Sequence, residues 1–388
     1  MTHVAPSYVA PAPATRAQGP HPDPAPQPPD AHAASVTRIL VHPCAGASDA
    51  AVAALVRRAV RIARRAGARL TFADVLPEVP ALVQRLLPEG VHVPELLREE
   101  RRRRLDALAR HARRAKVAVE LVLLEGSPAV ALVREVLRDG HDLLMLPTGA
   151  AAVGALGVQL VRKAPCPVLL IPAPADGAGA RRRPRILAAI DVSDAPPAGD
   201  APDVASPRTP AQTAGAALAR RILDAAAALA ALEGGELHVL HAWTAYGEGM
   251  LRGRAFGGIS AADVQRYVDG MEAHAATALG AAVAHLHRVL TPERVHLVKG
   301  EPGDVIPALV RAASADTLVV GTVARSGLAG LLVGNTAERL VEAPPCDVLV
   351  VKPAGFSTTV RPDDELARGQ TMRPAARAVP VLVASLAT

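Results

Sequence analysis

The stretch Asp316–Pro353, DTLVVGTVARSGLAGLLVGNTAERLVEAPPCDVLVVKP, decides the fold of this chain. Its apolar, β-branched runs Thr317–Val320 and Val348–Val351 predict two buried parallel strands. The loop between them carries several glycines and leads to Asn335 and Thr336, residue types that favour the start of a helix. A glycine loop that joins the carboxyl end of a strand to a helix N-terminus favours phosphate, because free N–H groups and the helix dipole meet there.

The spacing of this loop is Gly321-x2-Ala324-x9-Gly334-Asn335. It resembles the Gly-x2-Gly-x9-Gly-Ser/Thr pattern of the nucleotide-binding universal stress proteins, and the flanking segments are similar to that family as well. Two motif positions differ, because Ala324 replaces a glycine and Asn335 replaces a serine or threonine. The resemblance implies the adenine nucleotide alpha hydrolase-like α/β fold of that family.

Three segments of the chain recur in the same order, which indicates a tandem duplication. The matched pairs are RILVHPC at 38–44 with RILAAID at 185–191, residues 125–146 with 299–320, and residues 163–173 with 342–354. Each copy alternates strand and helix patterns, so a parallel sheet covered on both faces is expected. We therefore predict two tandem universal-stress-protein-like sandwiches, each with a five-stranded, mainly parallel sheet.

Composition and periodicity set the expected boundaries of the copies and the tails. A tail at 1–34, rich in proline and alanine, is expected to be disordered. The first copy spans 35–175, the linker 176–184, the second copy 185–354 and a C-terminal tail 355–388. Further predictions are loops at 77–90, 193–210 and 246–258, and helices at 94–114, 211–232 and 261–289.

The two copies differ at the nucleotide positions. Asp191 ends the first strand of the second copy and resembles the family's carboxylate near adenine and ribose, although an aspartate that caps the following turn fits equally well. Cys44 stands at this position in the first copy. The first copy's loop, counted from Pro147 to Cys166, is also six residues shorter, and proline offers no N–H to a phosphate. We expect no nucleotide in the first copy.

The resemblance assigns a nucleotide site to the second copy, for ATP with magnesium. The competing interpretation is a vestigial loop that packs against itself. The residues that would hold the nucleotide are Asp191, Gly321, Thr322, Gly334, Asn335 and Thr336.

Other polar clusters carry weaker signals. His42 and Cys44 would supply two metal ligands, but no third ligand lies near them in sequence, so no metal site is expected. The run Arg101–Arg104 predicts a solvated helix face. Trp243 and Tyr246 could line the crevice, but core or rim packing is the more common role of such residues.

Bulk composition narrows the function further. The net charge is +6, but aromatic residues make up only 2% and no recognition motif occurs, so nucleic acid is not expected as the main partner. The three cysteines are far apart, which favours free thiols in a reducing cytoplasm. No apolar run reaches the length of about 18 residues that a membrane span needs, so no membrane partner is expected.

The leading functional interpretation is a stress-response binding or regulatory module without catalysis and with an eroded first copy. The alternative is an ATP-binding sensor whose second copy hydrolyses ATP slowly. No Walker A motif, no HxGH or SGGxDS signature and no supported catalytic triad occurs, so no catalytic residue is assigned. The apolar segments CPVLLI and CDVLVV would be exposed edges, and we expect them to pair within the chain. The sequence leaves open whether two copies of the chain form a homodimer.

Overall fold

The computed structural model describes residues 36–86, 92–149, 151–173, 183–192, 210–253, 259–322 and 335–362. The disorder predicted for residues 1–34 lies outside this part of the chain. The same holds for the loop predicted at 193–210 up to residue 209, for most of the linker and for the C-terminal tail beyond residue 362.

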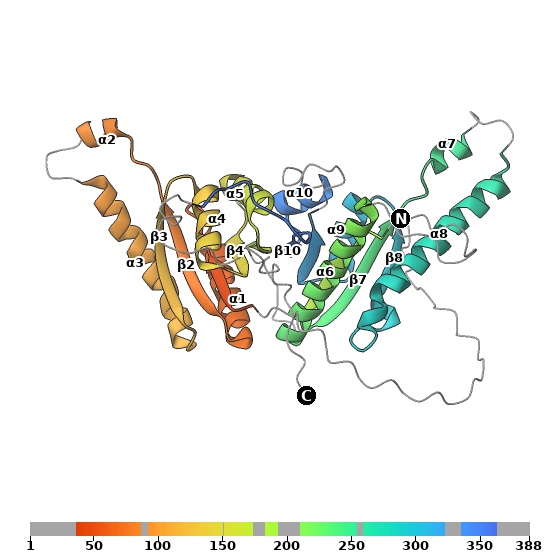
Figure 1. Ribbon diagram of the computed structural model, residues 1–388, viewed down its shortest axis with the longest axis horizontal. Helices are drawn as coiled ribbons and strands as arrows, with labels where there is room; N and C mark the ends of the chain where they lie inside the picture. Colours follow the sequence, from red (N-terminus) through yellow and green to blue (C-terminus); the bar gives the residue numbers. More distant parts are fainter. Residues whose placement is uncertain are drawn as a thin grey trace.

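Ten strands form one continuous sheet in the order β3-β2-β1-β4-β5-β10-β9-β6-β7-β8 (Figure 1). The strands are β1 (Arg38–Val41), β2 (Arg69–Leu76), β3 (Val119–Glu125), β4 (Leu143–Pro147), β5 (Val168–Ile171), β6 (Arg185–Ala189), β7 (Glu236–Trp243), β8 (Val295–Lys299), β9 (Thr317–Gly321) and β10 (Asp347–Val351). Read from its outer edge toward the middle of the sheet, the second copy has the order β8-β7-β6-β9-β10, which matches β3-β2-β1-β4-β5 of the first copy. The tandem duplication and the five-stranded parallel sheet of each copy are therefore confirmed.

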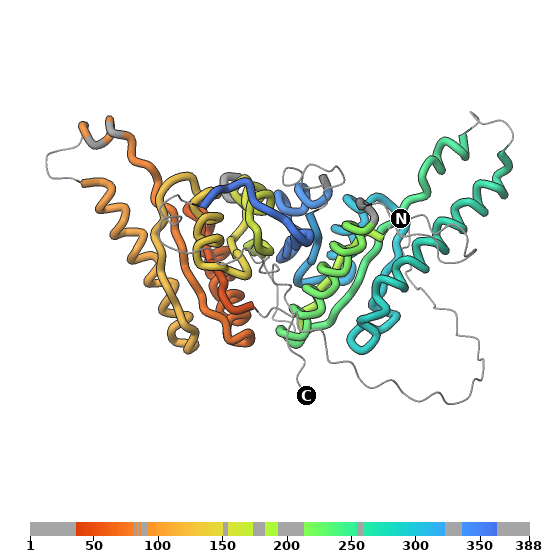
Figure 2. Tube along the Cα trace, in the orientation of Figure 1, coloured from red at the N-terminus to blue at the C-terminus, as the bar shows by residue number. Residues whose placement is uncertain are grey.

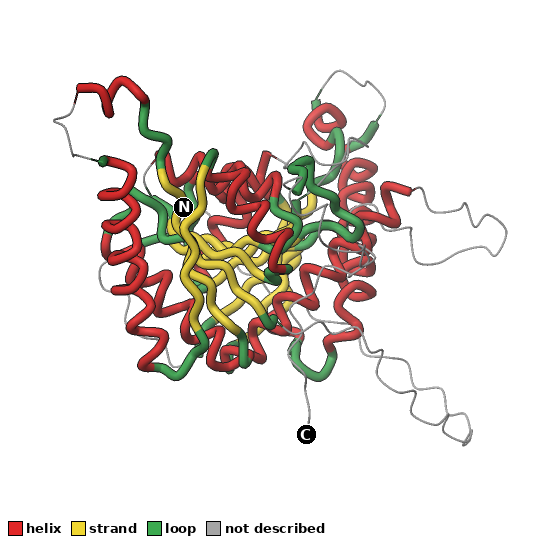
Figure 3. The backbone as a smooth tube through the Cα atoms, turned by 60° about the vertical axis from the view of Figure 1, so that its left-hand side comes forward, coloured by secondary structure: helices red, strands yellow, loops and turns green. Residues whose placement is uncertain are grey.

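The helices divide between the two faces of this sheet. They are α1 (Asp49–Ala66), α2 (Ala81–Leu86), α3 (Val93–Arg114), α4 (Pro128–Asp139), α5 (Ala151–Lys163), α6 (Pro210–Glu233), α7 (Glu248–Arg252), α8 (Ala261–Val283), α9 (Pro302–Ala312) and α10 (Asn335–Glu342). One apolar core lies beneath α1, α3, α6 and α8, and a second lies beneath α4, α5, α9 and α10. Figure 3 shows the strands enclosed by helices in this way.

Local signals explain why these helices begin and end where they do. The Ser48 hydroxyl accepts from the Ala51 N–H and begins α1, and Gly67 ends it in the left-handed conformation at φ 67°. Ser260 and Asp263 form a reciprocal capping box at the start of α8. Pro128 and Pro302 occupy the first turns of α4 and α9, where a missing N–H is tolerated.

The two copies join where β5 and β10 pair antiparallel, with Leu169 opposite Leu349. Every other neighbouring pair in the sheet is parallel. These strands are the segments CPVLLI and CDVLVV, so the prediction that they pair within the chain is confirmed. Figure 2 shows the two halves of the chain side by side about this junction. The chain beyond β10 then crosses to the first copy, where Arg134 of α4 donates to the carbonyl oxygen of Arg361.

Three predicted segments differ from the structure. The loop predicted at 77–90 contains α2, and the loop predicted at 246–258 contains α7. Helix α7 begins after Gly247, which adopts φ 72°, and its Glu248 pairs with Arg252 one turn later. The helix predicted to reach residue 289 ends at Val283 and continues as a short 3-10 turn over Ala284–Leu286.

Candidate functional site

The strand order reverses between β6 and β9 in the second copy, because β7 lies on the outer side of β6 and β10 on the outer side of β9. The crevice outside the carboxyl ends of two such strands is where open α/β sheets bind ligands. Ala188 of β6 is in register with Val319 of β9. Asp191 and Thr322, each three residues further on, therefore leave the sheet at the same level on neighbouring strands.

Asp191 is exposed at this edge. The carboxylate lies close enough to His241 of β7 to raise the pKa of that imidazole, although burial has the larger effect and lowers it. The His241 Nδ1 atom lies 3.2 Å from the carbonyl oxygen of Ile190. An exposed carboxylate beside a fixed imidazole can accept hydrogen bonds from ligand hydroxyls.

The other predicted residues take different places. Thr322 is buried, and its N–H donates to the carbonyl oxygen of Val351 at 3.1 Å. Thr336 is half-buried in the first turn of α10, where Asn335 is the first helical residue. Gly334 and the preceding loop from residue 323 lie outside the described residues. Asp191 and Thr322 thus follow neighbouring strands at the same edge of the sheet. The role predicted for Gly334 in phosphate binding stays a prediction.

Gly321 has a packing role that the motif interpretation missed. A Cβ atom at this position would lie 2.8 Å from Cδ1 of Ile222 and 2.9 Å from Cδ2 of Leu218, both in α6. The absence of a side chain therefore lets α6 cross β9 closely. A glycine at the first motif position therefore favours this helix packing whether or not phosphate binds.

The corresponding edge of the first copy is filled by protein. Cys44 is buried, and burial raises the pKa of its thiol to about 12. The His42 Nδ1 atom lies 2.9 Å from the carbonyl oxygen of Ala73. Pro147 ends β4 and α5 begins at Ala151, so little chain is left for a phosphate loop.

Two arginines of α3 also reach this edge, so the predicted solvated face holds for only half of the run Arg101–Arg104. Arg101 contacts the buried Asp74 at 3.4 Å, and Arg104 donates to the carbonyl oxygen of Cys44 at 3.3 Å. Arg102 and Arg103 of this run are exposed, Arg103 at 77% of its side chain. The spacing of Arg101 and Arg104 with the buried Leu105 was the signal that could have identified an inward face.

The remaining candidates have structural roles. Trp243 is buried in a small cluster with Val268 and Ala275, whereas Tyr246 is 88% exposed. All three cysteines are free thiols, as expected, and Cys44 and Cys166 are fully buried. In the first copy's shortened loop and the helix after it, a Cβ at Gly157 would make ordinary contacts with Leu170 at 3.5 Å and Val341 at 3.7 Å, whereas a Cβ at Gly149 or Gly154 would meet nothing within 4 Å.

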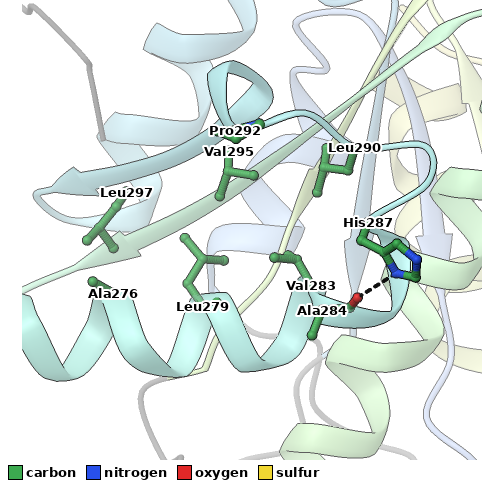
Figure 4. A pocket seen from close by; sticks show the side chains of 10 residues that line it. Ala276, Leu279, Val283, Ala284, His287, Leu290, Pro292, Val295 and Leu297 are labelled. Carbon is green, nitrogen blue, oxygen red and sulfur yellow. Dashed lines mark hydrogen bonds between the residues drawn. The ribbon is translucent and has the colours of Figure 1, made fainter. Parts of the chain in front are cut away.

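An apolar pocket of about 210 Å³ lies away from this edge, between α8 and β8 (Figure 4). It is lined by Ala276, Leu279, Gly280, Val283, Ala284, His287, Leu290, Pro292, Val295 and Leu297. On the corresponding helix of the first copy, Leu105, Ala109 and Ala112 of α3 are completely buried. The nearly all-apolar lining does not suit a phosphate group.

Comparison with known families agrees with this architecture. The profile of the Universal stress protein family matches residues 37–172 and 213–352, one match for each copy. The chain therefore belongs to the universal stress protein family and carries two of its domains in tandem.

Two relatives align with this chain over most of its length, and a third aligns over a short segment. The chain is 24% identical over 323 residues to universal stress protein E of Photorhabdus laumondii, a match that covers 79% of this chain and 92% of that protein. It is 44% identical to universal stress protein E of Escherichia coli K12 over 70 residues, which cover 18% of this chain and only 22% of that relative. The solved protein PA1789 of Pseudomonas aeruginosa superposes with a TM-score of 0.56 at 23% identity, covering 82% of this chain and 93% of that one.

Two shorter members of the family were solved with adenine nucleotides. One from Arabidopsis thaliana has AMP bound, at 19% identity, 37% coverage of this chain, 97% of that chain and a TM-score of 0.27. Another is a complex with cAMP, at 21% identity, 35% coverage of this chain, 97% of that chain and a TM-score of 0.25. Across the described residues of this chain, no helix combines the length and apolar character that crossing a membrane requires.

Proposed function

We propose that this chain is a cytoplasmic, non-catalytic regulatory module in which the second copy binds an adenine nucleotide and the first copy does not. The observation that carries this proposal is the placement of Asp191 and Thr322 at the strand-order reversal of the second copy. In the first copy, the equivalent edge holds a buried thiol, two inward arginines and an early helix.

The roles of the side chains follow from this geometry. The Asp191 carboxylate accepts hydrogen bonds from the ribose hydroxyls, and the start of α10 faces the phosphates with its free N–H groups and positive dipole end. Bound nucleotide changes the surface that a protein partner meets at this edge. The module acts through this change and needs no chemical step.

Calorimetric titration of the full chain with Mg-ATP, and separately with AMP, tests the proposal. Saturable binding is expected for the unaltered protein. It should be lost in Asp191→Ala, which removes the ribose acceptor, and in Gly334→Asp, which adds a negative charge before α10. Glu78→Ala, which alters an exposed carboxylate after β2 in the first copy, is the matched control and should bind normally. Absence of heat with the unaltered protein would overturn the nucleotide proposal.

A further inference from the structure

Three potential metal ligands converge at the end of α4 in the first copy. Glu135 and Asp139 lie one helical turn apart, so their carboxylates share a face. Gly140 ends the helix in the left-handed conformation, at φ 65°, and turns the chain back. The next residue, His141, lies beside Glu135 as a result, and one ligand atom from each of the three side chains lies within 4.8 Å of the others.

Two of these side chains are buried, and among the described residues only one of their four polar atoms has a hydrogen-bond partner, the Glu135 oxygen that accepts from Arg138. Glu135 is 0% exposed and His141 is 1% exposed at the side chain. Within the described part of the chain, Oε1 of Glu135 and both ring nitrogens of His141 have no hydrogen-bond partner. Buried polar atoms are normally satisfied, so three orphaned atoms at one place indicate a missing ligand.

The distance between the two groups fits an ion better than a hydrogen bond. His141 Nε2 lies 3.9 Å from Glu135 Oε1, which is too long for a hydrogen bond. Zinc ligands of these types lie about 2.0–2.2 Å from the metal, so two of them in a tetrahedral site are about 3.4 Å apart. A side-chain movement of about half an ångström would bring the two atoms onto one ion.

The second copy shows that the fold does not need these side chains. Residues 125–146 match residues 299–320, so Glu135, Asp139 and His141 correspond to Leu309, Ala313 and Ala315. Leu309 and Ala315 belong to the apolar core beneath α9. The same place in the fold is therefore apolar in one copy and carries three ligand types in the other.

We propose that Glu135, Asp139 and His141 form a binding site for a divalent transition-metal ion of the zinc class. One imidazole nitrogen and two carboxylates suit zinc, whereas magnesium and calcium prefer oxygen ligands alone. Asp139 is 32% exposed and provides the route of entry, with water as the further ligand. Arg138 pairs with Glu135 and lies 3.7 Å from Asp139. Its side chain is 43% exposed, so it can leave when the ion binds.

Titration of the chelator-treated full chain with zinc chloride, without nucleotide, tests this site. One zinc ion per chain is expected, together with a zinc-dependent rise in Tm, because an ion that binds only the folded state stabilises it. The key variant carries Glu135→Leu, Asp139→Ala and His141→Ala, the residues that the second copy uses. It should fold, as far-UV circular dichroism would show, and should lose both the bound zinc and the Tm rise.

A second histidine site provides the matched control. The rings of His238 and His296 stack with their nitrogens 3.2 Å apart, so they are a competing place for adventitious zinc. His238→Ala should retain the zinc ion and the Tm rise. Zinc binding that is unchanged in the triple variant, or lost in His238→Ala, would overturn the proposal, and so would the absence of zinc binding by the unaltered chain.

Discussion

At the scale of single residues, Arg58 of α1 connects the two copies. Its Nη2 atom lies 2.9 Å from Oε2 of Glu233 in α6 and donates to the Thr317 hydroxyl at 2.8 Å. Its Nη1 atom lies 2.9 Å from Oδ2 of Asp347 in β10. Burial raises the pKa of Asp347 to about 6, and the positive charge of Arg58 opposes this rise.

Replacing this arginine should be strongly destabilising. Arg58→Met removes the nearest cation from the buried Glu233 and the half-buried Asp347, and leaves Glu233 with Arg61 at 3.6 Å, so we expect the free energy of unfolding to fall by about 3 kcal/mol. Urea unfolding at pH 7 measures this change in the free energy of unfolding. Arg57→Met changes the exposed neighbour on the same helix and should alter stability by less than about 0.5 kcal/mol. Equal effects of the two variants would contradict the role given to Arg58.

Lys352 is a second residue that acts across the junction. Its Nζ atom donates to the carbonyl oxygen of Val161 at the end of α5. The residue four positions after Val161 is Pro165, which has no N–H to donate, so the lysine supplies the missing hydrogen bond. The Nζ atom also lies 4.2 Å from the centre of the Phe356 ring. Burial lowers the pKa of Lys352 from 10.5 to about 7.

This lysine should give the protein a specific pH dependence. Between about pH 7 and pH 10.5 the folded chain has released the proton that the unfolded chain still holds, so the free energy of unfolding should rise with pH. The Lys352→Met variant lacks this group, and its stability relative to the unaltered protein should fall over the same window. Urea unfolding at pH 7, 8 and 9 measures the difference. A constant difference between the two proteins across this range would contradict the prediction.

At the scale of elements, the crossing of α6 over β9 depends on Gly321. Gly321→Ala forces a Cβ to within 3 Å of Ile222 and Leu218, so we expect a loss of about 1–3 kcal/mol in stability. Gly321→Ala should cost less in a Leu218→Ala background than in the unaltered chain, because Leu218→Ala removes two of the three contacted atoms. Gly280→Ala is the control, since a Cβ at this helical position meets nothing within 4 Å and should stabilise by about 0.5–1 kcal/mol. Thermal unfolding compares the variants, and a neutral Gly321→Ala would show that α6 does not pack as described.

At the scale of the whole molecule, the two copies share one sheet and both apolar cores. Leu160 and Val161 of α5 lie in the same core as Leu340 and Val341 of α10. On the other face, α1 and α6 share the core that also lies beneath α3 and α8, and Arg65 of α1 donates to the carbonyl oxygen of Leu232 in α6. The junction thus combines strand pairing with apolar packing on both faces.

The halves should therefore stay together without a covalent link. If a protease site is inserted within 176–182 and cut, we expect both fragments to elute as one species in native size-exclusion chromatography. The cut protein with Arg58→Met should dissociate more readily, because that variant weakens the junction. Fragments that separate under native conditions would show that the pairing of β5 with β10 is too weak to hold the copies.

The sequence by itself determined the family, the duplication and the alternation of strands and helices in each copy, because these depend on short-range patterns. Alternating apolar runs, glycines and proline-bounded helices recur in both copies, and the shorter loop after Pro147 already separated the first copy from the second. The apolar character of β5 and β10 also predicted their pairing, since bare edges of this kind are avoided.

Only the tertiary structure decided which polar side chains meet. Arg58 and Asp347 are 289 positions apart, and Lys352 reaches a carbonyl 191 positions earlier. The packing role of Gly321 depends on where α6 crosses the sheet, and the ligand cluster around His141 depends on the left-handed turn at Gly140. Such contacts arise from the packing of distant elements, and no local pattern in the chain encodes that packing.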